Sequence, residues 1–141
     1  MYELNLIYPM FAMVLLTATV LGILFRSRVR AVRDQKVTTK YFRVFQGETE
    51  PEETAKPGRH FANLFEAPTL FYAACLAAMV TRQVGTTIVV LAWAYVAARL
   101  VHAGIHLGSN RLRFRIRAYF ASWLVLGAMW IWLVAGVATA G

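Results

Sequence analysis

The chain has 141 residues, of which 59% are hydrophobic and only 16% are charged. Soluble domains carry about 25% charged residues, so this composition excludes an intrinsically disordered chain and argues against a water-soluble globular monomer. The length predicts a single domain over residues 1–141, and the formal charge of +8 has to be placed relative to the apolar segments before any partner is inferred.

Four apolar segments follow one another along the chain. Charge-free runs of 22 residues at 4–25 and of 24 residues at 118–141 are each long enough for a membrane-spanning helix, which needs about 20 residues. The runs at 67–81 and 83–98 reach this length only if their helices continue through the flanking polar residues. We therefore predict an all-α integral membrane protein, a four-transmembrane-helix bundle, with helices at about 4–27, 58–81, 84–113 and 117–139.

The basic residues are distributed unequally between the connections. Residues 26–60 contain nine Lys and Arg and residues 107–117 contain four, whereas the connection on the opposite side contains only Arg82. The positive-inside rule places both basic connections in the cytoplasm and both termini on the other side of the membrane. Contacts with anionic lipid head groups explain the net charge, so nucleic acid is not an expected partner.

The first connection, residues 28–57, is the only long one. Its segment 46–58 contains four glutamates, two prolines and two glycines. This composition predicts a solvated, mobile loop. Pro57 and Gly58 are expected to end the loop and start the second helix.

A narrow polar stripe follows the second helix. Arg59, Asn63 and Glu66 are spaced i, i+4, i+7 and fall within an arc of about 60°. An ionisable group inside a membrane span is costly and usually functional. The alternative is an internal network in which Arg59 and Asn63 only neutralise Glu66.

A longer polar stripe follows the third helix, within an arc of about 80°. Its five members are Arg99, His102, His106, Asn110 and Arg113. Such a stripe predicts a polar cleft that opens toward the cytoplasm. His102 and His106 also have the i, i+4 spacing of a two-histidine metal site, but no third ligand stands out beyond Glu66, so no metal is predicted.

Other arginines lie near these stripes. Arg111 and Arg115 fall about 120° and 160° from the third-helix face and are expected to contact lipid head groups. Arg117 joins the face if the helix extends that far. Arginines at the end of the first helix are within reach of a site and also serve as orientation signals; these are Arg28, Arg30 and Arg33.

Two segments resemble motifs of the MAPEG family, the membrane-associated proteins of eicosanoid and glutathione metabolism. RHFANLFEAP, residues 59–68, resembles the second-helix glutathione motif, an Arg followed by Asn at +4 and an acidic residue at +7. ARLVHAGIHLGSNRLR, residues 98–113, resembles the third-helix motif, in which an Arg is followed by aromatic or His positions at +3 and +7. An Arg at +14 corresponds to the one that activates the glutathione thiol. The resemblance covers the whole chain and suggests a bacterial-type member.

The chain departs from the family pattern at a few positions. The glutathione enzymes of the family often have Tyr at the positions of His102 and His106, and several relatives have Tyr at the position of Ala67. The first connection is also longer than in the compact eukaryotic members. These departures concern the substrate and catalysis rather than the fold.

The resemblance implies glutathione as co-substrate and a homotrimer with sites between subunits. Arg113 is then the catalytic residue, and the candidate binding residues are Arg59, Asn63, Glu66, Arg99, His102, His106 and Arg30. A guanidinium can bind a glutathione carboxylate, and Glu66 can bind the ammonium.

The predicted function is that of a glutathione-dependent transferase or peroxidase acting on lipophilic electrophiles or hydroperoxides. Its predicted location is a bacterial inner membrane, in contact with membrane lipid. Two alternatives stay open: a non-catalytic lipid- or glutathione-binding protein of the same fold, and a small transporter or ion-conducting oligomer.

Overall fold

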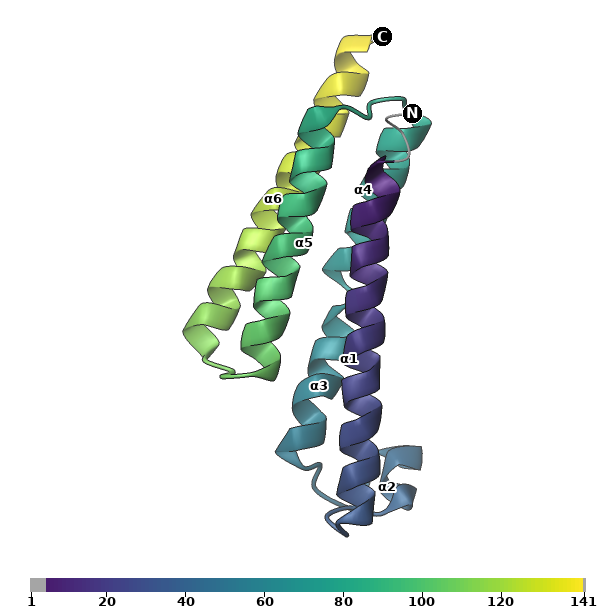
Figure 1. Cartoon of the computed structure of the whole chain (residues 1–141), viewed down its shortest axis with the longest axis vertical. Coiled ribbons are helices and arrows are strands. Elements are labelled where there is room, and N and C mark those ends of the chain that lie inside the picture. The colour runs from purple at the N-terminus through teal and green to yellow at the C-terminus, as the bar shows by residue number, and fades with distance from the viewer. Residues whose placement is uncertain (1–4, 141) are drawn as a thin grey trace.

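The computed structural model describes residues 5–140, and every element of regular structure in that range is helical. The helices are α1 (Ile7–Arg33), α2 (Thr39–Val44), α3 (Glu52–Asn63), α4 (Ala67–Val80), α5 (Thr86–Leu107) and α6 (Leu112–Ala140) (Figure 1). Because α3 and α4 form one interrupted span, four segments of the described chain are long and apolar enough to cross a membrane. The predicted all-α, four-span fold is confirmed; Leu4, the expected start of the first helix, lies outside the described residues.

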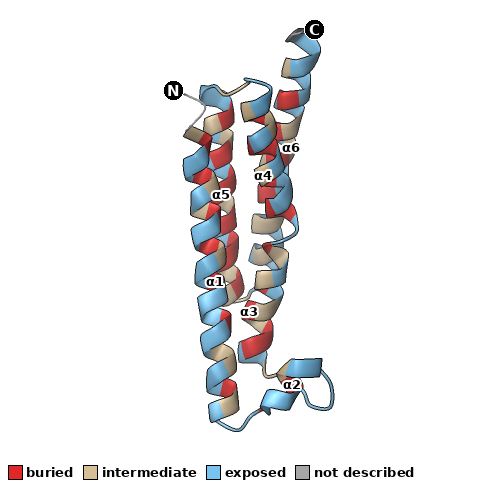
Figure 2. Cartoon of the chain, turned by 90° about the vertical axis from the view of Figure 1, so that its right-hand side faces the viewer, coloured by how far each residue is buried: buried red, intermediate tan, exposed pale blue. Residues whose placement is uncertain are grey.

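The spans pack in two pairs that meet in one apolar core. α5 lies along α6, and α1 lies along α3 and α4 (Figure 1). Residues from different spans meet in the core, where the rings of Phe71 and Tyr95 stack with centroids 4.5 Å apart. Much of the outer surface of the helices is exposed (Figure 2). The exposed side chains include large apolar ones such as Phe11 and Leu124. Hydrocarbon solvates such faces, and the intact helices satisfy their own backbone groups, as a lipid environment requires.

The described chain starts and finishes at one end of the bundle, and both basic connections lie at the other end (Figure 1). Four crossings of a membrane produce this arrangement. The side that faces the cytoplasm stays a prediction from the positions of the basic residues.

A reporter that folds only in the cytoplasm tests this orientation when fused to Gly141. We expect no signal, because the connections with nine and four basic residues should remain cytoplasmic. The same reporter inserted at Gly47, in the first connection, should give a strong signal. The reverse pair of results would overturn the orientation.

Two helix boundaries in the first half of the chain differ from those predicted. α1 continues to Arg33 instead of ending near residue 27, because no Gly or Pro interrupts it after Gly22 and its arginines are good helix formers. α3 begins at Glu52, so Pro57 lies inside the helix instead of at its start. Acidic residues in the first turn of α3 interact favourably with the helix dipole.

The acidic segment 46–58 is attached to the start of the first connection, in contrast to the mobile loop expected there. Lys36 Nζ donates to both carboxylate oxygens of Glu53, at 2.8 and 3.0 Å, and this contact raises the pKa of Lys36. The backbone N–H of Thr38 donates to Glu48 at 3.0 Å, and the Thr38 hydroxyl donates to the same carboxylate. One sequence-distant ion pair and two hydrogen bonds from Thr38 therefore order a segment whose composition alone favours disorder.

A glutamine fixes the turn between α4 and α5 against α6. We assign the Gln83 amide the orientation that satisfies both of its neighbours, in which its nitrogen donates to the Leu133 carbonyl at 3.2 Å and its oxygen accepts from the Val137 N–H at 3.1 Å. These two backbone groups are helical hydrogen-bond partners one turn apart, so the amide inserts into the ladder of α6. Gly136 makes room for it, since a Cβ there would lie 2.7 Å from the Gln83 amide carbon.

We therefore expect Gly136→Ala to lower the unfolding temperature of the purified protein in mild detergent. The added methyl group displaces Gln83, and two hydrogen bonds are lost at a cost of about 1–3 kcal/mol. Gly127→Ala is the matched control, because a Cβ at Gly127 meets nothing within 4 Å. The control should be neutral or stabilising through helix propensity. Equal behaviour of the two variants would contradict the role of Gln83.

Candidate functional site

The break between α3 and α4 positions the polar residues of the second span, which was predicted to be one continuous helix. Pro68 has no backbone N–H and cannot donate to the carbonyl of Leu64, so the helical ladder stops there. The N–H of Glu66 donates to the Asn63 carbonyl at 3.3 Å, only three residues back. Arg59 and Asn63 therefore lie on α3, whereas Glu66 is the residue immediately before α4.

The turn after α5 corrects the predicted third helix. α5 ends at Leu107 instead of at 113. A Cβ at Gly108 would lie 2.8 Å from the Gly104 carbonyl oxygen, and Asn110 adopts a left-handed φ of +48°. A new helix begins at Leu112, so the helical-wheel positions assigned to residues 110–117 on the third helix are wrong.

The start of α6 directs a different arginine toward the site. One pocket of the chain lies between α3, α5 and α6 and is called the main pocket below. Arg113 and Arg117 are exposed and do not line this pocket, whereas Arg115 is half-buried and lines it. Arg115 Nη1 donates to Asn110 Oδ1 at 2.7 Å. The turn residue thus holds the guanidinium of an arginine that was expected to contact lipid head groups.

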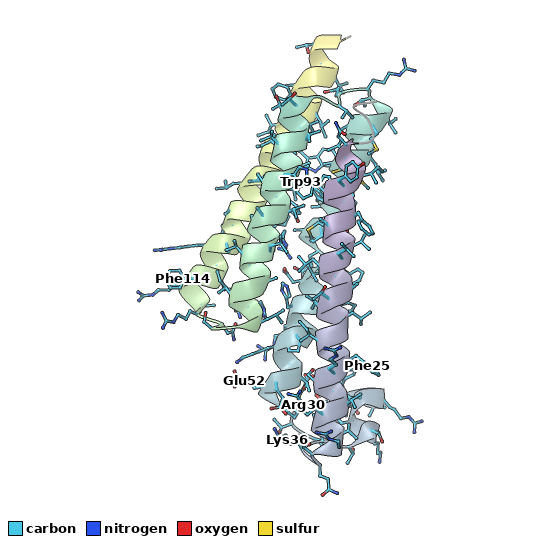
Figure 3. All side chains as sticks on the ribbon, in the orientation of Figure 1. Phe25, Arg30, Lys36, Glu52, Trp93 and Phe114 are labelled. Carbon is cyan, nitrogen blue, oxygen red and sulfur yellow. The ribbon has the colours of Figure 1, made fainter. Side chains whose placement is uncertain are left out.

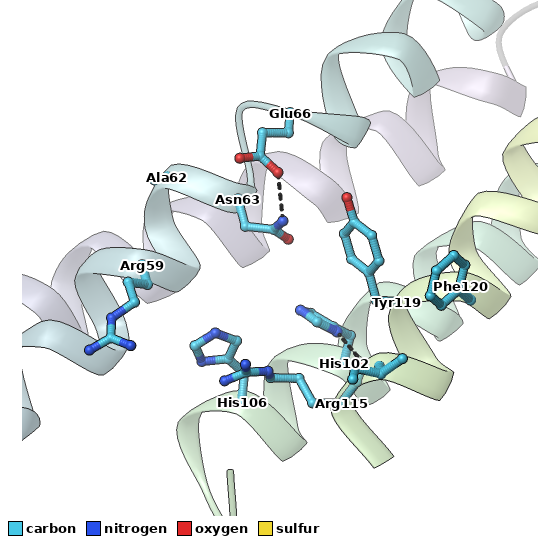
Figure 4. Close-up of a pocket in the computed structure, with 10 residues that line it drawn as sticks. Arg59, Ala62, Asn63, Glu66, His102, His106, Arg115, Tyr119 and Phe120 are labelled. Atoms are coloured by element: carbon cyan, nitrogen blue, oxygen red, sulfur yellow. Dashed lines mark hydrogen bonds between the residues drawn. The ribbon is translucent and has the colours of Figure 1, made fainter. Parts of the chain in front are cut away.

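The main pocket has a volume of about 510 Å³ and lies between α3, α5 and α6 (Figure 4). Its polar lining consists of Arg59, Asn63, Glu66, His102, His106 and Arg115. Its other lining residues are Ala62, Ile116, Tyr119 and Phe120. The pocket therefore combines polar groups of both charges with apolar and aromatic surface, as expected for a site that holds a charged molecule beside an apolar one.

A chain of hydrogen bonds crosses from α5 to the α3–α4 break. The buried Arg99 donates from Nη2 to Asn63 Oδ1 at 2.6 Å. Asn63 Nδ2 in turn donates to Glu66 Oε2 at 2.8 Å (Figure 4). The Asn63 amide is thereby fixed in one orientation. Arg99 acts on the pocket wall through Asn63 and is not itself part of the lining.

The charges on the pocket wall are not neutralised by one another. Within the described residues, Arg59 forms no ion pair, and Glu66 has only the Asn63 amide as a side-chain partner. Of the internal network considered as the alternative, the described chain therefore contains the Asn63–Glu66 hydrogen bond but no Arg59–Glu66 ion pair. A cation and an anion of the wall are both free to bind a ligand that carries both charges.

Three histidine rings pack together beside the pocket. The ring centroid of His60 lies 5.5 Å from that of His102 and 5.0 Å from that of His106. His102 Nδ1–H donates to the Arg115 carbonyl at 3.2 Å, while both nitrogens of His60 have no partner in the described part of the chain. No three His, Cys, Asp or Glu side chains among residues 5–140 are arranged to hold a metal ion. The rings therefore add hydrogen-bonding capacity for water or for a ligand.

The sequence-predicted residues are only partly brought together. Five of them share the pocket and Arg99 contacts one of these, whereas Arg30 lies on the part of α1 that extends beyond the α5–α6 turn (Figure 3). The stripe pattern did not identify Arg115 and Tyr119, which face the pocket together at i and i+4 on α6. The signal for them was Gly108–Asn110, whose composition is typical of a turn that resets the helical register.

A family model described as the MAPEG family matches residues 6–135. The chain belongs to the MAPEG family. No curated protein and no solved structure shows a significant match. The matched region includes both sequence motifs and every residue that lines the pocket. The resemblance seen in the motifs is thus confirmed, and the chain is an integral membrane protein of a family that generally uses glutathione.

Proposed function

We propose that this MAPEG protein is a glutathione-dependent membrane transferase or peroxidase acting on lipophilic electrophiles or hydroperoxides. The observation that carries the proposal is the pair of free opposite charges, Arg59 and Glu66, on the wall of one pocket that also has aromatic surface. Glutathione carries two carboxylates, one ammonium and one thiol. The lining provides a group of opposite charge for both kinds of ionised group.

The binding mode follows from the chemistry of each wall residue. The Arg59 guanidinium binds one carboxylate in a bidentate pair. Glu66 binds the ammonium, and the Asn63 amide, oriented by Arg99, holds the peptide group. These interactions orient the tripeptide with its thiol toward α6.

Arg115 is the pocket arginine best placed to stabilise the thiolate. A free thiol of this type has a pKa of about 8.5, and a nearby guanidinium lowers it. The thiolate sulfur then forms a bond to an electrophilic carbon of the second substrate, whose leaving group departs with the bonding electron pair. With a hydroperoxide, two glutathione molecules supply two electrons and two protons, giving glutathione disulfide, an alcohol and water.

We infer that the second substrate arrives laterally from the bilayer, past Tyr119 and Phe120 on the pocket wall. We also propose a homotrimer with sites between subunits, in which Arg113 or Arg30 of a neighbouring subunit completes the pocket. Location in a bacterial inner membrane, with the pocket open to the cytoplasm, is part of the same proposal. The resemblance to the family and the basic connections near the pocket end of the bundle support it.

Titration of the purified protein with glutathione tests the proposal. We expect a saturable ultraviolet difference signal in the thiolate band at neutral pH, together with turnover of a model electrophile. Saturable binding without a thiolate signal would instead favour a non-catalytic binding protein. The observation that supports this second function is the presence of His102 and His106 at positions where the family's glutathione enzymes often have Tyr. Absence of binding would contradict both the glutathione-dependent enzyme and a glutathione-binding protein, and would favour the lipid-binding alternative.

A further inference from the structure

A second pocket lies at the end of α1, outside the candidate glutathione site. It has a volume of about 600 Å³ and lies between the last turns of α1 and the short helix α2. Apolar side chains and two arginines line it together, among them Phe25, Arg28, Val29, Arg33, Thr39 and Phe42. None of these residues lines the main pocket, so the proposed glutathione chemistry does not use them.

The pocket lies at the level where α1 leaves the apolar part of the bilayer. At about 1.5 Å per residue, the helix from Ile7 to Phe25 is about 27 Å long, close to the thickness of a hydrocarbon core. The first charge follows at Arg26, and Arg30 lies on the part of α1 beyond the α5–α6 turn (Figure 3). Phe25 and Val29 are 67% and 51% exposed, so the wall of the pocket that they form continues as an apolar surface along the membrane-spanning part of α1.

The two arginines differ in how they are held. The guanidinium carbon of Arg28 lies 5.2 Å from the ring centroid of Phe42 and 5.5 Å from that of Phe45, which fixes the side chain over an aromatic platform. Its Nε is buried without a hydrogen-bond partner in the described chain. Arg33 has one loose contact, from Nε to Asp34 at 3.6 Å, which leaves the outer edge of its guanidinium for a ligand.

We propose that this pocket binds the phosphodiester head group of an anionic phospholipid. Arg28 and Arg33 bind the phosphate oxygens, and the Thr39 hydroxyl is available as a further donor. The acyl chains then follow the exposed apolar face at Phe25 and Val29 into the bilayer. The combination of two guanidinium groups with a continuous apolar wall favours a lipid over a soluble phosphate, which would leave the apolar wall exposed to water.

Native mass spectrometry of the detergent-purified full chain tests the assignment. Phosphatidylglycerol, phosphatidylcholine and glycerol 3-phosphate are the three probes, and Arg28→Gln/Arg33→Gln is the test variant. Lys40→Gln/Arg43→Gln removes the same charge from exposed positions of α2 outside the pocket and is the matched control. Arg28→Lys provides a milder test, since it keeps the charge and loses bidentate geometry.

We expect the unmodified protein to bind phosphatidylglycerol in preference to both other probes. The test variant should lose about tenfold or more of this affinity, and the control less than about twofold. The affinity of Arg28→Lys should fall between those of the test variant and the control.

Equal losses in the test variant and the control would overturn the proposal in favour of general electrostatic attraction. Equal binding of glycerol 3-phosphate would assign the pocket to a free phosphate. An altered oligomeric mass in the test variant, without any lipid preference, would assign it to a subunit contact.

Discussion

Replacing Arg115 by alanine is expected to abolish the thiolate signal of bound glutathione at neutral pH while glutathione still binds. Arg115 lines the pocket and is positioned by Asn110, whereas the proposed binding mode assigns the carboxylate and ammonium contacts to Arg59 and Glu66. In a pocket with apolar walls the guanidinium is poorly screened, and lowering the thiol pKa by one unit corresponds to about 1.4 kcal/mol. Turnover at neutral pH should therefore fall by about 10- to 100-fold.

The pH dependence of turnover distinguishes a loss of thiolate stabilisation from a structural defect in the Arg115→Ala variant. Without Arg115 the bound thiol returns toward its ordinary pKa of about 8.5, so the thiolate forms only as the pH rises through that value. Raising the pH should then partly restore the rate of the variant and change that of the unmodified protein little. This restoration would not follow from a purely structural defect.

Arg113→Ala measured in parallel decides between the two arginines. Arg113 is exposed and outside the pocket lining in the single chain, so we expect the variant to keep its thiolate signal. Arg111→Ala is a second control, because Arg111 is exposed and outside the pocket lining. Loss of the signal in the Arg113 variant alone would show that the arginine at +14 from Arg99 activates the thiol.

Glu66→Ala is expected to weaken glutathione binding by about 10- to 100-fold and to leave the unfolding temperature nearly unchanged. A charge-assisted hydrogen bond is worth about 1.5–3 kcal/mol, and every 1.4 kcal/mol is about tenfold in affinity. Glu66 is exposed on the pocket wall and bonds only to the Asn63 side chain among the described side chains. The hydrogen bond from the buried Arg99 to Asn63 Oδ1 remains after its removal. Isothermal titration and thermal unfolding measure the two effects separately.

Glu66→Gln is the matched variant for this prediction. It retains an acceptor for the Asn63 amide and removes only the negative charge. We expect the same loss of glutathione affinity with full stability. A large loss of stability with unchanged affinity in both variants would assign Glu66 to the fold alone.

The spans and the number of crossings could be predicted from the sequence because each depends on local properties. A charge-free run of 22 residues satisfies the length of a membrane helix by itself. The pair Arg59 and Asn63 could be placed on one face in the same way, since both lie within one uninterrupted helix, α3. Family membership also followed from local motifs.

Two short breaks decided which side chains meet, and the stripe analysis passed over both. Pro68 interrupts the second span, and the Gly108–Asn110 turn ends α5 at Leu107. A helical wheel assumes an unbroken register, so it assigned Arg113 to the polar face and Arg115 to lipid. The structure has the opposite arrangement, with Arg115 in the pocket and Arg113 exposed.

Only the tertiary structure determined the contacts between spans. Arg99 bonds to Asn63, 36 positions earlier in the chain, and His60 meets His102 and His106 through the packing of α3 against α5. Spacing along one helix defines a face but not the neighbour of that face, because the neighbour depends on how two helices cross. The sequence by itself thus determined the spans and the polar faces within the unbroken helices α3 and α5, whereas helix packing and the reset register of α6 determined the pocket.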